Sequence, residues 1–284
     1  MIGKYFILPL VALCSFSEIG FSQSNDQDTA SIESLEIDAG DEVVFTLDHL
    51  ARIPYLEMHQ VDTSIASLNT FGFAPDSVPV YDSAYYAAFL DSLDKRSPFD
   101  LVYNARTDAF IKLYAVKRRK STEKLLGLQH QYFPMMEELL AKYEMPFELK
   151  YLAVIESGLN PKARSKAGAV GLWQFMYTTG KMFDLHQNSY MDERMDPIKS
   201  TEAALQYLKY LYGIYHKWDL ALAAYNCGPG NVNRAMRRAG NSDGNYWDLY
   251  PFLPRETRGY VPAFIAVNYV MNNPSAHNLY PVMP

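Results

Sequence analysis

From Asn104 onward, apolar residues recur at helical spacing, and this pattern constrains the fold more than any other feature of the chain. The clearest stripe, at i, i+3, i+6 and i+7, consists of Phe133, Met136, Leu139 and Leu140. Such a stripe is typical of a helix packed on one side. Period-two alternation never extends beyond a few residues of 101–284. We therefore predict a mainly α fold, with one helical domain over 104–284.

Local signals predict where several helices begin and end. Asp196 followed by Pro197 has the form of an N-cap and a first-turn proline, so a helix should begin there. A short apolar helix over 219–226 should stop at Gly228. A last helix is expected over 257–271. These helices would form most of the predicted domain.

The first 103 residues carry different signals. Residues 1–22 have a positive start, an apolar run and small residues before a cleavage point, the layout of a secretory signal peptide. A buried N-terminal helix is the alternative. Residues 23–40 are predicted as a flexible linker because they are polar and poor in aromatics. Residues 41–103, with four prolines, are predicted as an irregular N-terminal extension.

Export follows from the predicted signal peptide, and it places the protein in the periplasm or cell envelope. Cys14 leaves a lipid anchor, and thus outer-membrane association, open as an alternative, although Leu13 is bulky for a lipidation site. Removal of the leader leaves Cys227 as the remaining cysteine, so an intramolecular disulfide is not expected. We expect Cys227 to be a small buried residue rather than a nucleophile.

Charge and ligand spacing exclude several classes of function. The net charge of −6 argues against a nucleic-acid-binding protein. Residues 23–100 hold 15 acidic and 3 basic residues, whereas 101–284 hold 16 acidic and 22 basic ones. This mild basic excess suits an anionic partner, and a mixed solvated surface explains it equally well. The six histidines lack metal-ligand spacing, so neither a metal site nor a cofactor is expected.

Glu156 is the carboxylate with the most unusual surroundings. It follows four apolar residues, 152–155, in a helix expected to begin near Pro146 and to end at Gly158. Apolar neighbours and the negative end of the helix dipole both disfavour the ionised carboxylate, so we expect a raised pKa. A general acid needs such a pKa near neutral pH. A solvent-facing or ion-paired glutamate is the alternative.

Several motifs follow Glu156 in order along the chain. They are Glu156-Ser-Gly-Leu-Asn-Pro161, Ala163-Arg-Ser165-Lys-Ala-Gly-Ala-Val-Gly171-Leu-Trp-Gln-Phe-Met176, Ala223-Ala-Tyr-Asn-Cys-Gly-Pro-Gly230 and Glu256-Thr-Arg-Gly-Tyr-Val-Pro262. This ordered set resembles the lytic transglycosylase domain of glycoside hydrolase family 23, the SLT type, over roughly 105–273. The resemblance implies a lysozyme-like, goose-type helical domain that binds a peptidoglycan strand in a cleft.

The same resemblance implies a reaction. The β-1,4 bond between N-acetylmuramic acid and N-acetylglucosamine would be cleaved without water, and the muramoyl 6-hydroxyl would close a 1,6-anhydro ring. Glu156 would protonate the leaving oxygen and then accept the proton of that hydroxyl. No second carboxylate occurs in 157–183, which fits a single-carboxylate scheme, although a hidden second carboxylate stays open. Asp196 is expected to cap a helix, and Asp184, Asp192 and Glu193 are expected to be surface or turn residues.

The remaining site residues carry over from the motifs one at a time. The substrate-binding residues implied beside catalytic Glu156 are Ser157, Ser165, Gln174, Tyr225, Asn226 and Tyr260. A helix C-cap is the alternative for Ser157, and a turn hydroxyl is the alternative for Ser165. Each tyrosine could equally be a core residue, and core packing is expected for Trp173. Gly168 and Gly171 are expected to allow a close backbone approach.

The chain departs from many members of the family in one respect, since no LysM-type repeat follows the predicted domain. Peptidoglycan glycan strands are the expected partner, and a monomer is the expected state. Two other functions stay open: a hydrolytic muramidase of goose-type lysozyme character, and a non-catalytic peptidoglycan-binding protein.

Overall fold

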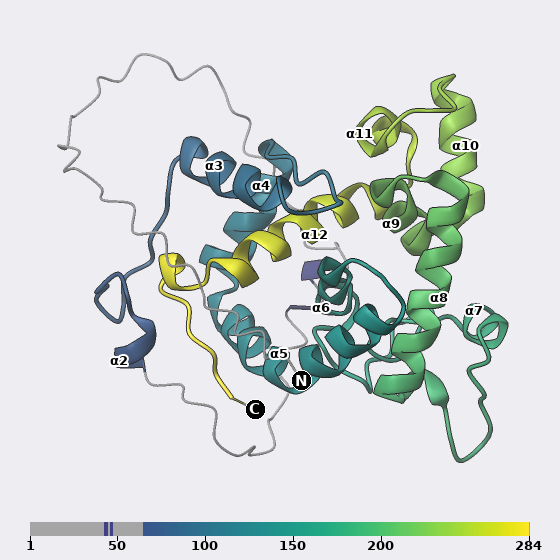
Figure 1. The fold of residues 1–284 in the computed structure, drawn as a ribbon, viewed down its shortest axis with the longest axis horizontal. Helices are drawn as coiled ribbons and strands as arrows, with labels where there is room; N and C mark the ends of the chain where they lie inside the picture. The colour runs from purple at the N-terminus through teal and green to yellow at the C-terminus, as the bar shows by residue number, and fades with distance from the viewer. Residues whose placement is uncertain (1–42, 45, 48–64, 284) are drawn as a thin grey trace, which may run out of the picture. The chain divides into compact units, whose positions relative to one another are not determined.

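The computed structural model describes residues 43, 44, 46, 47 and 65–283 of the 284-residue chain (Figure 1). The predicted signal peptide, the predicted linker and Cys14 lie outside the described residues, as does part of 41–103. The described residues form helices and turns, with isolated bridges in place of strands. The predicted mainly α fold is therefore confirmed.

The helices follow one another in the order α2 (Ile65–Leu68), α3 (Ser83–Asp94), α4 (Ala105–Lys112), α5 (Arg119–Lys142), α6 (Leu152–Ser157), α7 (Tyr177–Met182), α8 (Pro197–Tyr215), α9 (Trp218–Cys227), α10 (Pro229–Ala239), α11 (Tyr246–Leu249) and α12 (Thr257–Asn272). A π-helical turn, η1 (Leu113–Lys117), joins α4 to α5. Short 3₁₀ turns are η2 (Phe147–Tyr151), η3 (Glu193–Met195), η4 (Tyr250–Phe252) and η5 (Ser275–His277).

Helices with strong local start signals begin where we expected. The Asp196 carboxylate accepts hydrogen bonds from the N–H groups of Ile198 and Lys199, both at 2.9 Å, and so caps α8. α9 and α12 match the predicted helices over 219–226 and 257–271. A side-chain cap and a first-turn proline thus identify the start of α8 in the sequence, whereas α9 and α12 begin without a side-chain cap.

Three segments differ from the expectation. The predicted helix from Pro146 forms a 3₁₀ turn, η2, before it becomes α6. Gly228 ends α9 as expected, but Pro229 immediately begins α10, because a proline fits the first turn of a new helix. The extension over 41–103 contains the twelve-residue helix α3, which we did not predict; Asp82 caps it by accepting from the Tyr85 N–H.

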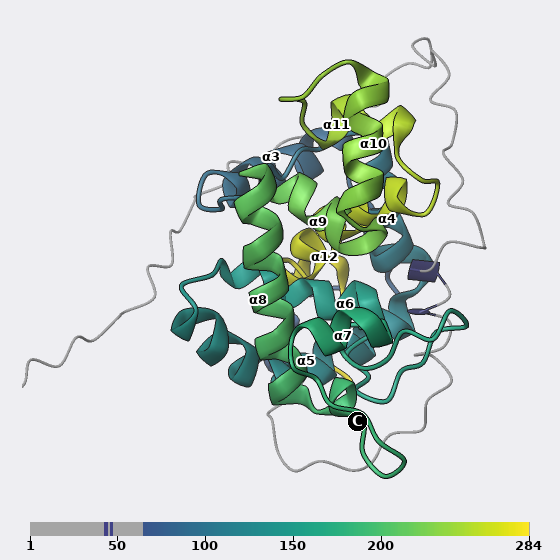
Figure 2. The same cartoon turned by 90° about the vertical axis from the view of Figure 1, so that its right-hand side faces the viewer.

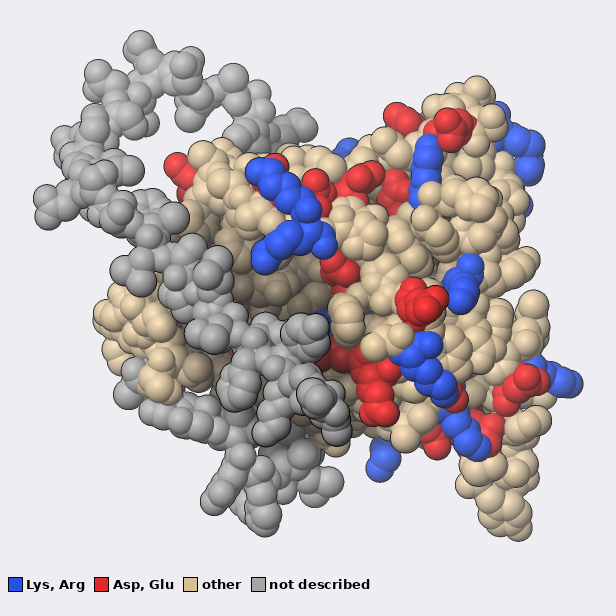
Figure 3. Space-filling model, viewed as in Figure 1, with Lys and Arg blue, Asp and Glu red and all other residues tan. Residues whose placement is uncertain are grey.

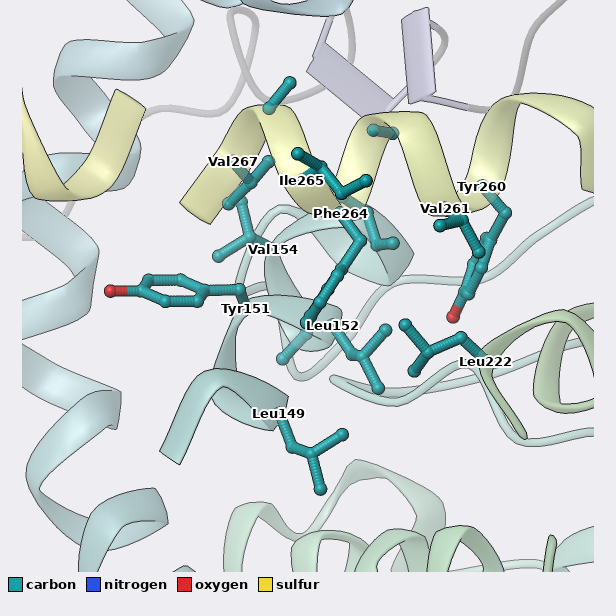
Figure 4. Close-up of a cluster of buried hydrophobic side chains, with 14 of the residues drawn as sticks. Leu149, Tyr151, Leu152, Val154, Leu222, Tyr260, Val261, Phe264, Ile265 and Val267 are labelled. Atoms are coloured by element: carbon teal, nitrogen blue, oxygen red, sulfur yellow. The ribbon is translucent and has the colours of Figure 1, made fainter. Parts of the chain in front are cut away.

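α12 is the central helix of the core. Figures 1 and 2 show it in yellow, and it packs against α4, α6 and α9. Figure 4 shows buried side chains of α12, among them Val261, Phe264 and Val267, beside Leu152 and Val154 of α6. Burial of so many large apolar side chains is the main driving force for this packing. The two helices that carry Glu156 and Tyr260 are therefore held by one core.

The C-terminal residues pack against the extension and α5. The Tyr81 hydroxyl donates to the Ala276 carbonyl at 2.8 Å, and the Asn278 amide donates to the Ser77 carbonyl at 2.9 Å. The Val282 N–H donates to the Glu123 carbonyl at 2.9 Å. Tyr86 and Leu90 of α3 are buried in the same core as α12. The described part of the extension is thus packed as part of the helical unit.

Acidic and basic side chains are interspersed over the face drawn in Figure 3. Such mixing agrees with a solvated surface and offers a partner no broad field of one sign. A membrane-spanning helix is not found among the residues that the structure describes, since none of their helices is both long and apolar enough.

Candidate active site

One cavity of about 500 Å³ lies beside the end of α6. This volume is in the range of pockets that hold small ligands or a few sugar rings. The cavity wall includes all seven predicted site residues: Glu156, Ser157, Ser165, Gln174, Tyr225, Asn226 and Tyr260. They come from α6, the loop before α7, α9 and α12, so residues far apart in sequence are brought to one place.

Glu156 lies in the last turn of α6, where the chain brings a carboxylate to the cavity. Gly158 caps the helix in the left-handed conformation, with φ 60° and ψ 36°, as expected from the sequence. The neighbours Ile155 and Ser157 are buried, whereas Glu156 is half-buried. The hydroxyl of Tyr260, a buried residue of α12, donates a short hydrogen bond to Glu156 Oε1. The carboxylate is thereby oriented by a residue of another helix.

Two hydroxyls tie the loop that follows α6 to its surroundings. The Ser157 hydroxyl lies 3.1 Å from the Ala153 carbonyl and 2.9 Å from the Leu172 carbonyl, so its one proton serves both. The Tyr225 hydroxyl donates to the Trp173 carbonyl at 2.9 Å. Burial, and next the charge of Glu156, raise the pKa of Tyr225 well above its usual value, so this phenol stays neutral. Both residues position the loop.

Ser165 and Gln174 present polar groups on the loop over 163–175. The Ser165 oxygen accepts from the Ala169 N–H at 3.0 Å, which leaves its own proton for another acceptor. The Gln174 amide nitrogen donates to the Gly171 carbonyl at 2.9 Å. Gln174 itself has a φ of 46°, a conformation unusual for a side-chain-bearing residue. Its fixed amide nitrogen leaves the amide oxygen as the group to accept from a ligand.

Arg194 is a buried residue whose side chain supports this loop by hydrogen bonds. Its guanidinium donates to the carbonyls of Gly168 and Phe175, at 3.2 and 3.0 Å, and to Asp192. The hydrogen bond from Arg194 holds the pKa of Asp192 below its usual value. Our expectation that Asp192 and Glu193 are surface or turn residues was wrong for their side chains, which are buried. Each carboxylate is paired, Asp192 with Arg194 and Glu193 with Lys199, because an unpaired buried charge would be costly.

Asn226, near the end of α9, also lines the cavity. Its amide oxygen accepts from the Thr257 hydroxyl at 2.8 Å, which directs the amide by a contact between α9 and α12. The amide nitrogen is a donor for a ligand on the cavity wall. Cys227 also lines the cavity and is half-buried, and burial raises the pKa of its thiol. A neutral thiol fits the expected unreactive role.

The cavity wall contains further residues that we did not predict. They are Val43, Thr46, Arg164, Tyr207 and Glu256, among others. Glu256 is a second carboxylate on the wall, in the Glu256-Thr-Arg motif and outside the segment 157–183. Trp173 is fully buried and donates to the Thr201 hydroxyl at 2.9 Å, which agrees with the expected core role. Within the described ranges, no three His, Cys, Asp or Glu side chains gather around a metal-sized space.

Residues 134–247 match the family described as the transglycosylase SLT domain. Over these residues the chain is thus similar to SLT domains, and its helical fold and its half-buried glutamate agree with this similarity. The chain is also similar to membrane-bound lytic murein transglycosylase D of Escherichia coli (strain K12), with 38% identity over 135 residues, 46% of this chain and 29% of the relative.

Two further similarities extend this comparison. Soluble lytic murein transglycosylase of Escherichia coli (strain K12) is 36% identical over 121 residues, 39% of this chain and 18% of the relative. The crystal structure of the 70 kDa soluble lytic transglycosylase of Escherichia coli aligns with a TM-score of 0.43 and 21% identity, over 79% of this chain and 42% of that one. The chain spans less than a third of the length of these curated relatives.

Proposed function

We propose that this protein is a peptidoglycan lytic transglycosylase. It cleaves the β-1,4 bond between N-acetylmuramic acid and N-acetylglucosamine and forms a 1,6-anhydro muramoyl end. One observation carries this proposal: the glutamate of an SLT domain faces a sugar-sized cavity and accepts a hydrogen bond from a buried tyrosine. The homology to lytic murein transglycosylases supports the same conclusion.

Glu156 transfers the proton in both halves of the proposed reaction. Because Tyr260 donates to Oε1, the protonated acid carries its proton on Oε2 and gives it to the leaving glycosidic oxygen. The resulting carboxylate then accepts the proton of the muramoyl 6-hydroxyl as that oxygen bonds to C1. The proton count balances, no water is consumed, and Glu156 ends protonated again.

The neighbouring polar groups hold the sugar while this proton moves. The Ser165 proton, the Asn226 amide nitrogen and the Gln174 amide oxygen offer two donors and one acceptor to hydroxyl and N-acetyl groups. Such fixed groups favour catalysis by orientation, since they hold the reacting atoms close together. Positive charge at C1 is balanced by the substrate's own N-acetyl oxygen, as in other substrate-assisted glycosidases.

Hydrolysis is the second candidate because Glu256 places another carboxylate on the cavity wall. A muramidase of goose-type character would use such a group to activate water. Its products would end in reducing muramic acid, one water molecule heavier than the anhydro product. The mass of the released muropeptides therefore distinguishes the two reactions.

The decisive experiment is digestion of purified sacculi by wild type, Glu156→Gln and Tyr260→Phe, with mass spectrometry of the products. Wild type should release anhydro-muropeptides. Glu156→Gln should fold normally and lose at least about 10²-fold in rate, the scale of a lost general acid. Tyr260→Phe should lose less because it orients the acid without transferring the proton. Full activity of Glu156→Gln would refute this role. Absence of released muropeptides with wild type as well as with Glu156→Gln would indicate a protein that binds peptidoglycan without cleaving it.

The proposed place of action is the cell envelope, where the substrate lies. Peptidoglycan strands are the partner, and the chain acts as a monomer. A lipid anchor at Cys14 remains a proposal that labelling of intact cells with a radioactive fatty acid would test. Incorporation lost in Cys14→Ala would support the anchor.

A further inference from the structure

We propose that a short segment of the N-terminal extension supplies a substrate-binding wall of the active site, with Thr46 as a glycan-binding residue. This segment, the N-terminal wall, consists of Val43 and Thr46, which line the cavity, and of Val44 and Leu47, which anchor them in the core. The inference rests on the proposed function, and it assigns to the extension a part in sugar recognition. Residues 43–47 precede the matched SLT domain by more than eighty positions along the chain.

The N-terminal wall is anchored in the core of the domain. Its residues have helical conformation, and Val43, Val44 and Leu47 are 5%, 6% and 1% exposed. The hydroxyl of Ser121, near the start of α5, donates to the Leu47 carbonyl at 2.9 Å, and this contact is buried. A segment with this burial and this hydrogen bond is a fixed part of the fold. It appears in purple among the helices of Figure 1.

Helical spacing explains how one short segment serves both core and cavity. Residues three apart lie on the same side of a helix, so Val43 pairs with Thr46 and Val44 pairs with Leu47. Val43 and Thr46 both line the cavity that contains Glu156 and Tyr260. Val44 and Leu47 belong to the hydrophobic core and do not line the cavity. One side thus anchors the segment while the other faces the ligand space.

The chemistry of these two wall residues suits a sugar. Val43 offers an apolar surface of the kind that packs on the face of a pyranose ring or on an N-acetyl methyl. Thr46 is half-buried, and in the described part of the chain its hydroxyl has no hydrogen-bond partner. A hydroxyl on a cavity wall can both donate and accept, which matches a sugar hydroxyl or an N-acetyl group. We therefore assign the Thr46 hydroxyl to a direct hydrogen bond with the glycan.

The test measures glycan binding in the full chain with Glu156→Gln as the background, so that the ligand is not consumed. The probe is a soluble, peptide-free strand of alternating N-acetylglucosamine and N-acetylmuramic acid, titrated by calorimetry. Adding Thr46→Val, which keeps the shape and removes the hydroxyl, should weaken binding about fivefold, equivalent to about 1 kcal/mol. Thr46→Ser keeps the hydroxyl and should bind as the background does. Thr70→Val, a substitution of an exposed threonine outside the cavity, is the matched control.

Two results would overturn the assignment. Unchanged affinity of Thr46→Val would show that the hydroxyl does not bind the glycan. Equal weakening by Thr46→Val and Thr46→Ser would show that binding responds to any change of shape at this position and is not specific to the hydroxyl. Failure of the proposed function is a separate result, because the chain without these substitutions would then release no anhydro-muropeptides from sacculi.

Discussion

At the scale of single residues, Glu156 and Tyr260 meet across 104 positions of sequence. Neither side chain is held by its own helix alone: α6 directs the carboxylate, and α12 supplies the hydroxyl. Asn226 is directed in the same way by Thr257 on α12. The site therefore depends on pairs of residues on different elements, and one element cannot move without disturbing its partner.

His277 predicts a pH dependence of stability. The His277 side chain is fully buried, and its Nε2 lies 2.9 Å from the Tyr269 hydroxyl. Burial lowers the pKa of the imidazole from 6.5 to about 4. Above pH 6.5 the imidazole is neutral in both states and its full stabilisation is present. As the pH falls from 6.5 to 4, the unfolded chain takes up a proton that the folded chain does not, so stability declines.

The measurement is urea unfolding of wild type and His277→Gln at pH 7 and pH 4.5. Between these two values, wild type should lose roughly 2 to 3 kcal/mol more unfolding free energy than the variant. The glutamine variant keeps a polar group near Tyr269 but has no proton to bind in this range. An identical pH dependence of both proteins would show that His277 is not the group responsible.

At the scale of elements, the loop over 163–175 illustrates why two glycines have different roles. Both Gly168 and Gly171 have positive φ, 90° and 89°. A Cβ on Gly171 would lie 1.8 Å from the Arg194 carbonyl oxygen, whereas one on Gly168 would meet open space. The expected close backbone approach therefore occurs at Gly171 and not at Gly168.

Alanine substitutions at these two glycines form a matched pair. Gly168→Ala should cost about 1 to 2 kcal/mol, the strain of a left-handed residue alone. Gly171→Ala should cost more, at least about 3 kcal/mol, because the Arg194 backbone must also move. Urea unfolding of both variants gives the comparison. Equal destabilisation would contradict the role of the backbone contact.

Elements with local signals could be predicted from the sequence, and long-range features could not. α8 was predictable because Asp196 and Pro197 mark its start by short-range chemistry. The N-terminal wall was not, because its four residues gain their role only by contact with α5 and the cavity. The burial of Asp192 depends likewise on Arg194 reaching two distant carbonyls. The seven predicted site residues came from motifs far apart in sequence, and the structure places all of them on the wall of one cavity.

At the scale of the whole molecule, the extension and the predicted domain share one core. Tyr86 and Leu90 of α3, with Phe99 and Leu101 after it, are buried against the elements that follow. Fully burying each such side chain contributes about 1.5 to 3 kcal/mol. Their sum is comparable to the entire stability of a typical domain. The predicted border at residue 103 therefore marks a change in sequence pattern, while the described residues on its two sides pack into the same core.

A protein begun at Asn104 tests this conclusion. We expect it to lack a cooperative thermal transition, or to melt far below a protein begun at residue 41, because the removed residues leave apolar surface exposed. Circular dichroism during heating provides the measurement. A cooperative transition at the same temperature for both proteins would show that the extension is dispensable for folding.

The central position of α12 has a consequence for heat resistance. In many enzymes the catalytic groups lie on loops that loosen well before the remainder of the molecule does. Here the hydroxyl that contacts Glu156, the proposed acid, belongs to the buried central helix α12. If the proposed function holds, warming should therefore abolish turnover and tertiary structure together, without an intermediate range of temperature in which an intact but inactive protein accumulates.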